Sequence, residues 1–116
     1  MKFIIADDDE RFRKYLREFI TKEGDECIEL DDGIKVSSVY KEFCPDWVLL
    51  DILMKNVSGF KAAEQLKKNF PEARIVIISS YSDERFRKKA KKVGAVTFVS
   101  KENLFDLKEF IYPDVL

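Results

Sequence analysis

Hydrophobic residues along the chain follow two spacings. Short runs of consecutive apolar residues alternate with longer segments in which apolar residues recur every three or four positions. An unbroken apolar run is typical of a strand buried on both faces, whereas the wider spacing is typical of an amphipathic helix. The runs predict strands at residues 2–6, 26–30, 47–50, 74–78 and 95–99. The wider spacing predicts helices at residues 12–20, 36–43, 60–70, 83–93 and 104–111.

Glycine, proline and asparagine mark the ends of the predicted helices. We expect Gly24 to end the first helix as a left-handed cap and Gly94 to end the fourth. Pro45 and Pro71 close the second and third helices, because proline cannot continue a helix. Asn103 can cap the N-terminus of the last helix.

Strands and helices that alternate along a chain indicate a parallel α/β sheet covered on both faces. Right-handed connections favour a doubly wound, flavodoxin-like sheet of five strands in the order 2-1-3-4-5, with five helices. The second strand carries charges, Glu26 and Glu29, which suits an edge of the sheet. A chain of 116 residues holds one hydrophobic core, so we expect a single domain over 1–116.

Composition narrows the classes of function. Hydrophobic residues make up 46% of the chain and charged residues 37%, which fits a water-soluble globular protein. A formal net charge of -1 gives no overall field that would attract nucleic acid or a membrane, so we expect neither as a partner. Neither a long apolar run nor a signal-peptide pattern is present, which makes the cytoplasm the default location.

Two residue types limit the chemistry further. Cys27 and Cys44 lack the spacing of metal ligands, and we interpret both as packed thiols in a reducing compartment. The chain contains no histidine. This excludes catalysis by histidine, metal binding by histidine and a role as a histidine phosphocarrier.

Acidic residues follow two of the predicted strands at their carboxyl ends. Asp7 and Asp8 leave the first strand, and Asp51 ends the third, inside an otherwise apolar stretch. In a sheet of order 2-1-3-4-5 these two strand ends lie side by side where the winding reverses, which is where ligands bind in such folds. Carboxylates that converge repel one another unless a cation joins them, and oxygen ligands without nitrogen or sulfur favour Mg2+.

Two further polar residues follow the remaining strands, Ser79 after the fourth and Lys101 after the fifth. A metal site flanked by a hydroxyl and an ammonium group suits a phosphoryl group bound to a carboxylate. Each feature alone has a simpler explanation: acidic residues before a helix cap it, a serine after a strand forms a turn, and a lone lysine is solvated. The specific signal is that all of them meet at one edge of the sheet.

With these residues in place, the chain closely resembles the receiver domain of two-component response regulators over essentially its full length. The resemblance rests on residues 4–9, 49–54, Gly59, 77–79, 94–95 and Lys101. It implies that Asp51 accepts a phosphoryl group from a histidine kinase or phosphotransfer protein. It also implies that Asp8, Asp51 and the Leu53 carbonyl bind Mg2+ directly, and that Asp7 acts largely through water.

The resemblance implies roles for five side chains. Ser79 resembles the switch hydroxyl, although Ser80 is an alternative, and Phe98 resembles the aromatic residue that rotates with the switch. Lys101 resembles the lysine that pairs with the phosphoryl oxygens. Leu53 and Tyr81 occupy the positions two beyond the acceptor and the switch, which flank the path of the water that removes the phosphoryl group.

The chain departs from the receiver pattern at three positions. Receivers usually have a proline after the methionine at the place of Met54, where this chain has Lys55. They usually have a threonine as the switch residue, where this chain has Ser79. The proline that usually follows the lysine is Glu102. A cis bond before a residue other than proline costs about 2.5–4 kcal/mol, so we expect a trans bond between Lys101 and Glu102.

Two other functions compete with that of a phosphorylated receiver. A Mg2+-dependent phosphatase could use Asp51 as its nucleophile, but haloacid-dehalogenase phosphatases carry a general acid two residues later, where this chain has Leu53. A degenerate receiver could serve only as a protein-binding module, but the set Asp8, Asp51, Ser79 and Lys101 is intact. We also expect a weak homodimer that depends on phosphorylation, and either a stand-alone or an excised receiver.

Overall fold

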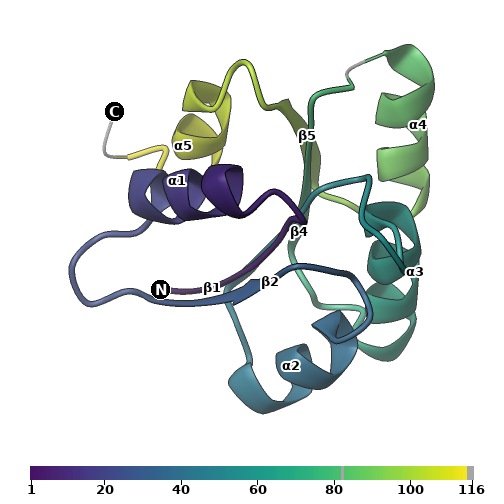
Figure 1. The fold of residues 1–116 in the computed structure, drawn as a ribbon, viewed down its shortest axis with the longest axis horizontal. Helices are drawn as coiled ribbons and strands as arrows, with labels where there is room; N and C mark the ends of the chain where they lie inside the picture. The colour runs from purple at the N-terminus through teal and green to yellow at the C-terminus, as the bar shows by residue number, and fades with distance from the viewer. Residues whose placement is uncertain (82, 115–116) are drawn as a thin grey trace.

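A five-stranded parallel sheet in the order β2-β1-β3-β4-β5 forms the centre of the molecule (Figure 1). The computed structural model describes residues 1–81 and 83–114. The strands are β1 (Lys2–Ala6), β2 (Glu26–Leu30), β3 (Trp47–Leu50), β4 (Ile75–Ser79) and β5 (Thr97–Ser100). This confirms the predicted doubly wound order, with the charged strand β2 at an edge.

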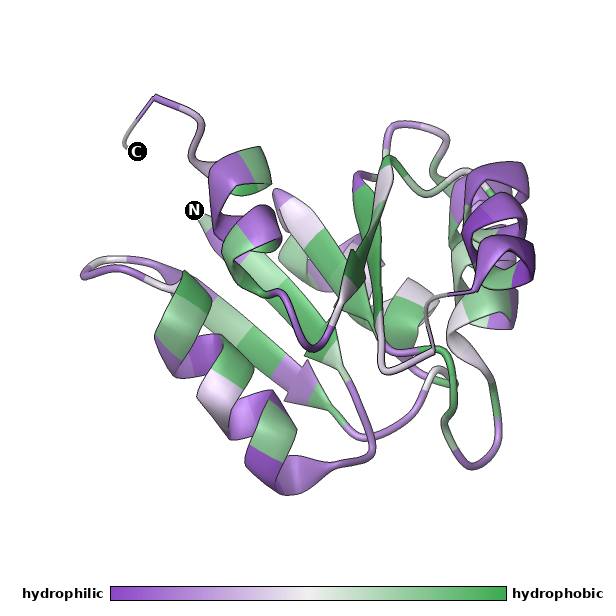
Figure 2. Cartoon of the chain, turned by 90° about the horizontal axis from the view of Figure 1, so that it is seen from above, coloured by the Kyte–Doolittle hydropathy of each residue, from purple (hydrophilic) through white to green (hydrophobic). Residues whose placement is uncertain are grey.

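Five helices cover the two faces of the sheet, with α1 and α5 on one face and α2, α3 and α4 on the other (Figures 1 and 2). The helices are α1 (Glu10–Ile20), α2 (Val36–Phe43), α3 (Gly59–Asn69), α4 (Glu84–Lys92) and α5 (Phe105–Ile111). Every helix in the described ranges is too short or too polar to cross a lipid bilayer.

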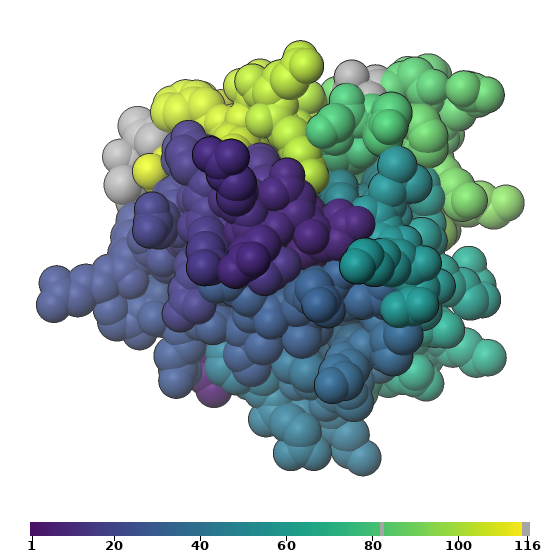
Figure 3. Space-filling view, viewed as in Figure 1, coloured from purple at the N-terminus to yellow at the C-terminus, as the bar shows by residue number. Residues whose placement is uncertain are grey.

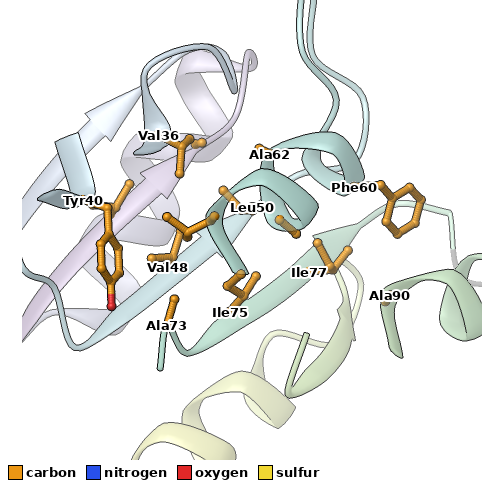
Figure 4. Packing of buried hydrophobic residues seen from close by; sticks show 14 of the residues in the cluster. Val36, Tyr40, Val48, Leu50, Phe60, Ala62, Ala73, Ile75, Ile77 and Ala90 are labelled. Carbon is orange, nitrogen blue, oxygen red and sulfur yellow. The ribbon is translucent and has the colours of Figure 1, made fainter. Parts of the chain in front are cut away.

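The central strands are buried along their whole length, as their unbroken apolar runs predicted. All residues of β3 and β4 are buried, whereas β2 is half-buried or exposed. On one face Val48, Leu50 and Ile77 pack against α2, α3 and α4 (Figure 4). Alternate residues such as Leu49 and Ile78 pack on the other face against α1 and α5. Burial on both sides fixes the register of the strands, and so the positions of the residues that follow them.

The helix ends confirm some of the sequence predictions. Asp83 caps α4 by accepting a hydrogen bond from the Phe86 N–H at 3.1 Å. Gly94 follows α4 with φ +95°, a left-handed conformation that glycine adopts without strain. All described peptide bonds are trans, so the Lys101–Glu102 bond is trans as expected.

The prediction that Gly24 caps α1 is wrong. The helix ends at Ile20, and the hydroxyl and N–H of Thr21 both donate to the Arg17 carbonyl, at 2.7 and 3.1 Å. These hydrogen bonds pair the Arg17 carbonyl in the last turn of α1, so the helix has already ended before Gly24. The positive φ of Gly24, +90°, instead serves the turn that leads into β2.

Two other expectations are also wrong. Asn103 does not cap α5: its side-chain amide donates to the Asp106 carboxylate at 2.9 Å, and α5 has no side-chain cap. Cys44 is not packed but exposed, and it ends α2 in a left-handed conformation with φ +52°. Cys27 is half-buried, and burial raises the pKa of its thiol to about 11.

Candidate functional site

Asp7 and Asp51 lie side by side because they follow adjacent parallel strands. The Asp51 N–H donates to the carbonyl of Ala6, the last residue of β1, at 2.9 Å. Asp7 is 2% exposed and Asp51 is 8% exposed, whereas Asp8 is exposed to solvent. One carboxylate oxygen from each of these residues lies within 4.8 Å of the other two. The predicted acidic cluster is therefore present, with two members buried and one at its mouth.

Lys101 provides the positive charge of the cluster. Its Nζ lies 2.9 Å from Asp7 Oδ2 and 3.5 Å from Asp51 Oδ1, with its side chain 15% exposed. The same Nζ lies 4.3 Å from the centre of the Phe12 ring, a favourable cation–π distance. The Lys101 N–H donates to the Ser79 carbonyl at 2.9 Å, so the ends of β4 and β5 are also joined at this edge.

The electrostatic environment shifts the pKa of both central groups. Burial and the charge of Asp7 raise the pKa of Asp51 to about 6, although Lys101 and the Ile52 N–H oppose the shift. For Lys101, burial alone would lower the pKa, but the hydrogen bond and charge of Asp7, together with Asp51, raise it. At neutral pH the lysine is charged and Asp51 is mostly ionised.

The acidic residues before α1 have separate roles. Asp9 is the N-cap of the helix and accepts a hydrogen bond from the Phe12 N–H at 3.2 Å. Asp7 accepts the Asp9 N–H at 2.8 Å, while its carbonyl accepts Arg13 Nη1 at 2.7 Å. The capping explanation thus applies to Asp9, and Asp7 and Asp8 remain for the acidic cluster.

The two candidate switch serines differ in burial. Ser79 is the last residue of β4 and is 1% exposed, and its Oγ accepts the Tyr81 N–H at 3.0 Å. Ser80 is exposed. Phe98 is half-buried on β5, where the Arg87 guanidinium lies 4.8 Å from its ring centre.

Leu53 and Tyr81 are both about half-exposed, at 54% and 52%. The Tyr81 ring leans toward α4, with its centre 5.9 Å from that of Phe86. Leu53 lies in the segment between β3 and α3, two residues after Asp51. Both side chains therefore border solvent on loops that follow site residues.

The donor set fits a hard cation. The cluster offers carboxylate oxygens only, and the charge of Lys101 balances one of its three acidic groups. Oxygen ligands with excess negative charge are the preferred environment of Mg2+. Asp7, Asp8 and Asp51 are thus able to hold this ion, and the buried pair gains most from its charge.

Gly59 and Asp32 have structural roles beside Asp51 that the sequence pattern did not predict. Gly59 is the first residue of α3, and a Cβ there would lie 1.9 Å from the Asp51 carbonyl oxygen. Asp32 accepts backbone N–H groups from the segment after β3. The sequence pattern marks Gly59 only as part of the receiver resemblance, and nothing in the pattern marks Asp32.

Comparison with known protein families adds independent information. The sequence profile of the family described as response regulator receiver domain matches residues 3–111. The chain is 34% identical over 98 residues to the chemotaxis protein CheY of Halobacterium salinarum, covering 84% of this chain and 82% of that protein. It is 35% identical over 104 residues to the transcriptional regulatory protein YhcZ of Bacillus subtilis, covering 88% of this chain. The matched part is about half, 49%, of the length of YhcZ.

A solved structure supports the same assignment of the fold. The CheX-CheY-BeF3-Mg+2 complex from Borrelia burgdorferi contains a chain that superimposes with a TM-score of 0.85 at 26% identity. The superposition covers 97% of this chain and 89% of that one. The likeness therefore extends over all five strands and the edge where the acidic cluster lies.

Proposed function

The chain belongs to the response regulator receiver family, and on that premise we propose that Asp51 accepts a phosphoryl group from a histidine kinase or phosphotransfer protein in a Mg2+-dependent reaction. One observation carries the proposal: Asp51 lies at the end of β3, 8% exposed, beside two other carboxylates and 3.5 Å from an ammonium group. Asp7 shares the burial, the neighbouring carboxylates and the contact with Lys101, at 2.9 Å, so the choice of Asp51 rests on the family resemblance, in which the residue after the third strand is the acceptor.

In the proposed step, a carboxylate oxygen of Asp51 forms a bond to phosphorus. The bond between phosphorus and the imidazole nitrogen of the donor breaks, and its electron pair stays on that nitrogen. A bound Mg2+ would supply charge that neutralises the phosphoryl oxygens. We assign the ion to Asp8, Asp51 and the Leu53 carbonyl, with Asp7 acting through water.

Lys101 and Ser79 complete the proposed mechanism. Lys101 Nζ is already within 3.5 Å of Asp51 and would move from the carboxylates to a phosphoryl oxygen. The Ser79 hydroxyl would donate to another phosphoryl oxygen, and Phe98 on β5 would follow that movement. Ser79 is our choice over Ser80 because it is buried at the strand end.

The direct test is incubation with acetyl phosphate and Mg2+, followed by intact mass measurement. The parent should gain one phosphoryl group, and Asp51→Asn should gain none. Asp31→Asn is a matched control, since Asp31 is exposed and has no ion pair or hydrogen-bonding side-chain partner among the described residues. A phosphoryl group retained in Asp51→Asn would refute the assignment of the acceptor.

We predict that Mg2+ stabilises the fold. A ligand that binds only the folded state adds about 2.7 kcal/mol when it is present at a hundredfold excess over its Kd. Asp8→Asn should remove this dependence on metal and should raise metal-free stability, because it relieves repulsion from Asp7 and Asp51. Melting temperature measured across a millimolar Mg2+ titration tests both effects, and a flat titration of the parent would count against a metal site.

We predict a long-lived phosphorylated state. Neither Leu53 nor Tyr81 carries a carboxylate or an amide that could orient the attacking water. Replacing Leu53 with Asn and Tyr81 with Ala should therefore speed the loss of phosphate by about tenfold, less than the roughly 100-fold or more that a fully positioned general base contributes. Following phosphoprotein decay by mass measures this rate. A parent that already decays as fast as the double variant would contradict the prediction.

A weak homodimer through α4, β5 and α5 is also part of the proposal. Helix α4 carries Arg85, Arg87, Lys88, Lys89, Lys91 and Lys92, whereas α5 and the preceding turn carry Glu102, Asp106 and Glu109. In Figure 2 the ribbon of α4 is coloured mostly as hydrophilic. Exposed ion pairs contribute about 0–1 kcal/mol each, so the dimer should be weak and should dissociate in high salt. Sedimentation with a phosphoryl mimic should show this, and no change at low salt would argue against it.

We also propose that the protein acts in the cytoplasm. Cys27 and Cys44 are both free, and free thiols persist in a reducing compartment.

A further inference from the structure

The Asp32 carboxylate joins two loops beside the acidic cluster. Asp32 lies between β2 and α2, and its oxygens accept three backbone N–H groups. Asp32 Oδ2 accepts from Asn56 at 2.7 Å, and Oδ1 accepts from Val57 at 3.1 Å and from Ile34 at 3.0 Å. Asn56 and Val57 belong to the segment between β3 and α3, which begins with Asp51. A single side chain therefore holds together segments that are 24 and 25 residues apart.

Gly33 brings the two loops into direct contact. A Cβ on Gly33 would lie 2.6 Å from the Val57 carbonyl oxygen and 3.1 Å from the Ala62 Cβ. In Figure 3 the blue surface after β2 borders the teal surface after β3. Only a residue without a side chain allows this approach, so the sequence Asp32-Gly33 forms one clamp, with the carboxylate bonding and the glycine making room.

The segment after β3 is anchored at both ends as well. At its start the Asp51 N–H donates to Ala6, and at its end the Gly59 N–H donates to the Ile52 carbonyl, both at 2.9 Å. Between these anchors, Asp32 supplies all the side-chain hydrogen bonds to the backbone of residues 53–57 that the described residues make. Asp32 thus holds the backbone of this segment at Asn56 and Val57, three and four residues after Leu53.

We infer that Asp32 is a positioning residue for the metal site: it sets the backbone of residues 53–57 so that the Leu53 carbonyl faces the ion, without touching the ion itself. The inference rests on the proposed function and extends it to a loop after a different strand. Residues that orient metal ligands from outside the coordination shell typically change metal affinity by about 10–100-fold when they are replaced.

A carboxylate suits this position better than an amide does. It accepts hydrogen bonds at both oxygens and donates none, so it can receive three N–H groups at once. Burial alone would raise the pKa of Asp32, but the N–H groups of Asn56, Ile34 and Val57 lower it. An asparagine would keep one accepting oxygen and would place an NH2 group against one of the N–H donors.

The experiment compares Asp32→Ala and Asp32→Asn with Asp31→Asn. The Asp31 variant removes the same charge one residue earlier, from an exposed side chain with no side-chain hydrogen bond or ion pair. Circular dichroism first confirms that each protein is folded at the working temperature. Two quantities are then measured: hydrogen exchange of the Asn56 and Val57 amides without metal, and the Mg2+ Kd by calorimetry.

We expect Asp32→Ala to lose protection at both amides and to raise the Mg2+ Kd by at least about tenfold. Asp32→Asn should lie between Asp32→Ala and the parent, because it keeps one acceptor. Asp31→Asn should keep the protection and should change the Kd by less than about threefold, as expected for a screened surface charge.

Several results would overturn the inference. If Asp32→Ala loses amide protection but keeps a Mg2+ Kd equal to that of Asp31→Asn, the clamp does not contribute to metal binding. A raised Kd with protection intact would mean that Asp32 acts only through its charge, and a variant that is unfolded at every temperature would make the clamp a stability element. A parent that binds no Mg2+ would refute the metal site of the proposed function and this inference together, whereas a parent that binds it isolates the inference.

Discussion

Replacing Lys101 with methionine is expected to lower the free energy of unfolding in metal-free buffer by about 3 kcal/mol. Methionine keeps most of the side-chain volume and removes the ammonium group. Asp7 and Asp51, 2% and 8% exposed, would then face each other without a positive charge. Breaking a buried ion pair by removing one partner is costly because it leaves the other partner buried and uncompensated.

Magnesium should restore most of the stability that Lys101→Met loses. The ion would supply positive charge to the same carboxylates, and without the competing ammonium it should bind more tightly than to the parent. Urea unfolding with and without saturating Mg2+ measures both quantities. The control is Lys92→Met on α4, which removes an exposed lysine and should change stability by less than about 0.5 kcal/mol.

The loss of unfolding free energy in Lys101→Met should also depend on pH. The pKa of Asp51 is about 6 in the folded protein, against about 3.9 for an unperturbed aspartate. Because the folded state binds this proton more tightly, its contribution to stability rises as pH falls through 6 toward 4. Lys101 lowers the pKa of Asp51, so in the variant this carboxyl takes up its proton at higher pH than in the parent. The variant should therefore recover toward the parent as pH falls from 8 to about 6, before the parent itself begins to gain stability. A loss that is the same at pH 5 and pH 8, or that Mg2+ leaves unchanged, would show that Lys101 acts only through packing.

The fold was predictable because burial on both faces leaves a strong pattern. The run from Trp47 to Leu50 has no polar break, and the structure buries each of its residues in the middle of the sheet. The strand order followed from the alternation of elements, and with it the convergence of Asp7 and Asp51. These positions depend on periodicity and topology, which a single sequence carries.

The remaining features depend on contacts between distant segments or on competition between local bonds. The clamp at Asp32 joins residues 24 positions apart, and a turn sequence alone does not specify its partner. The helix end at Thr21 was missed because a threonine hydroxyl and N–H ended α1 before the glycine could. Asparagine is a common N-cap residue, but the side-chain amide of Asn103 donates to the nearby Asp106 carboxylate instead. At Thr21 and Asn103 a neighbouring hydrogen bond decided the outcome, and at Asp32 the bonding partner lies far away in the sequence.

Replacing Gly59 with alanine is expected to damage both the fold and the proposed acceptor site at Asp51. The new Cβ would lie 1.9 Å from the Asp51 carbonyl oxygen, 2.8 Å from the Asp51 carbonyl carbon and 3.2 Å from the Ile52 Cα. These are backbone atoms and cannot rotate away as a side-chain tip can. Either the start of α3 must move outward or the backbone of Asp51 must shift, and such overpacking costs about 1–3 kcal/mol.

The effect on phosphorylation should exceed the effect on stability. The clash falls on the backbone of Asp51, the proposed acceptor, and a displacement of about 1 Å at a reacting group can cost about a hundredfold in rate. We expect Gly59→Ala to gain phosphoryl mass from acetyl phosphate and Mg2+ at least about tenfold more slowly than the parent. Gly24→Ala is the matched control: its φ of +90° strains an alanine, but no atom lies within 4 Å of the new Cβ, and it is remote from Asp51 in the turn before β2. That control should lose about 1 kcal/mol of stability and keep the parent rate. A Gly59→Ala protein that is phosphorylated as fast as Gly24→Ala would mean that the tight contact between α3 and Asp51 does not position the acceptor.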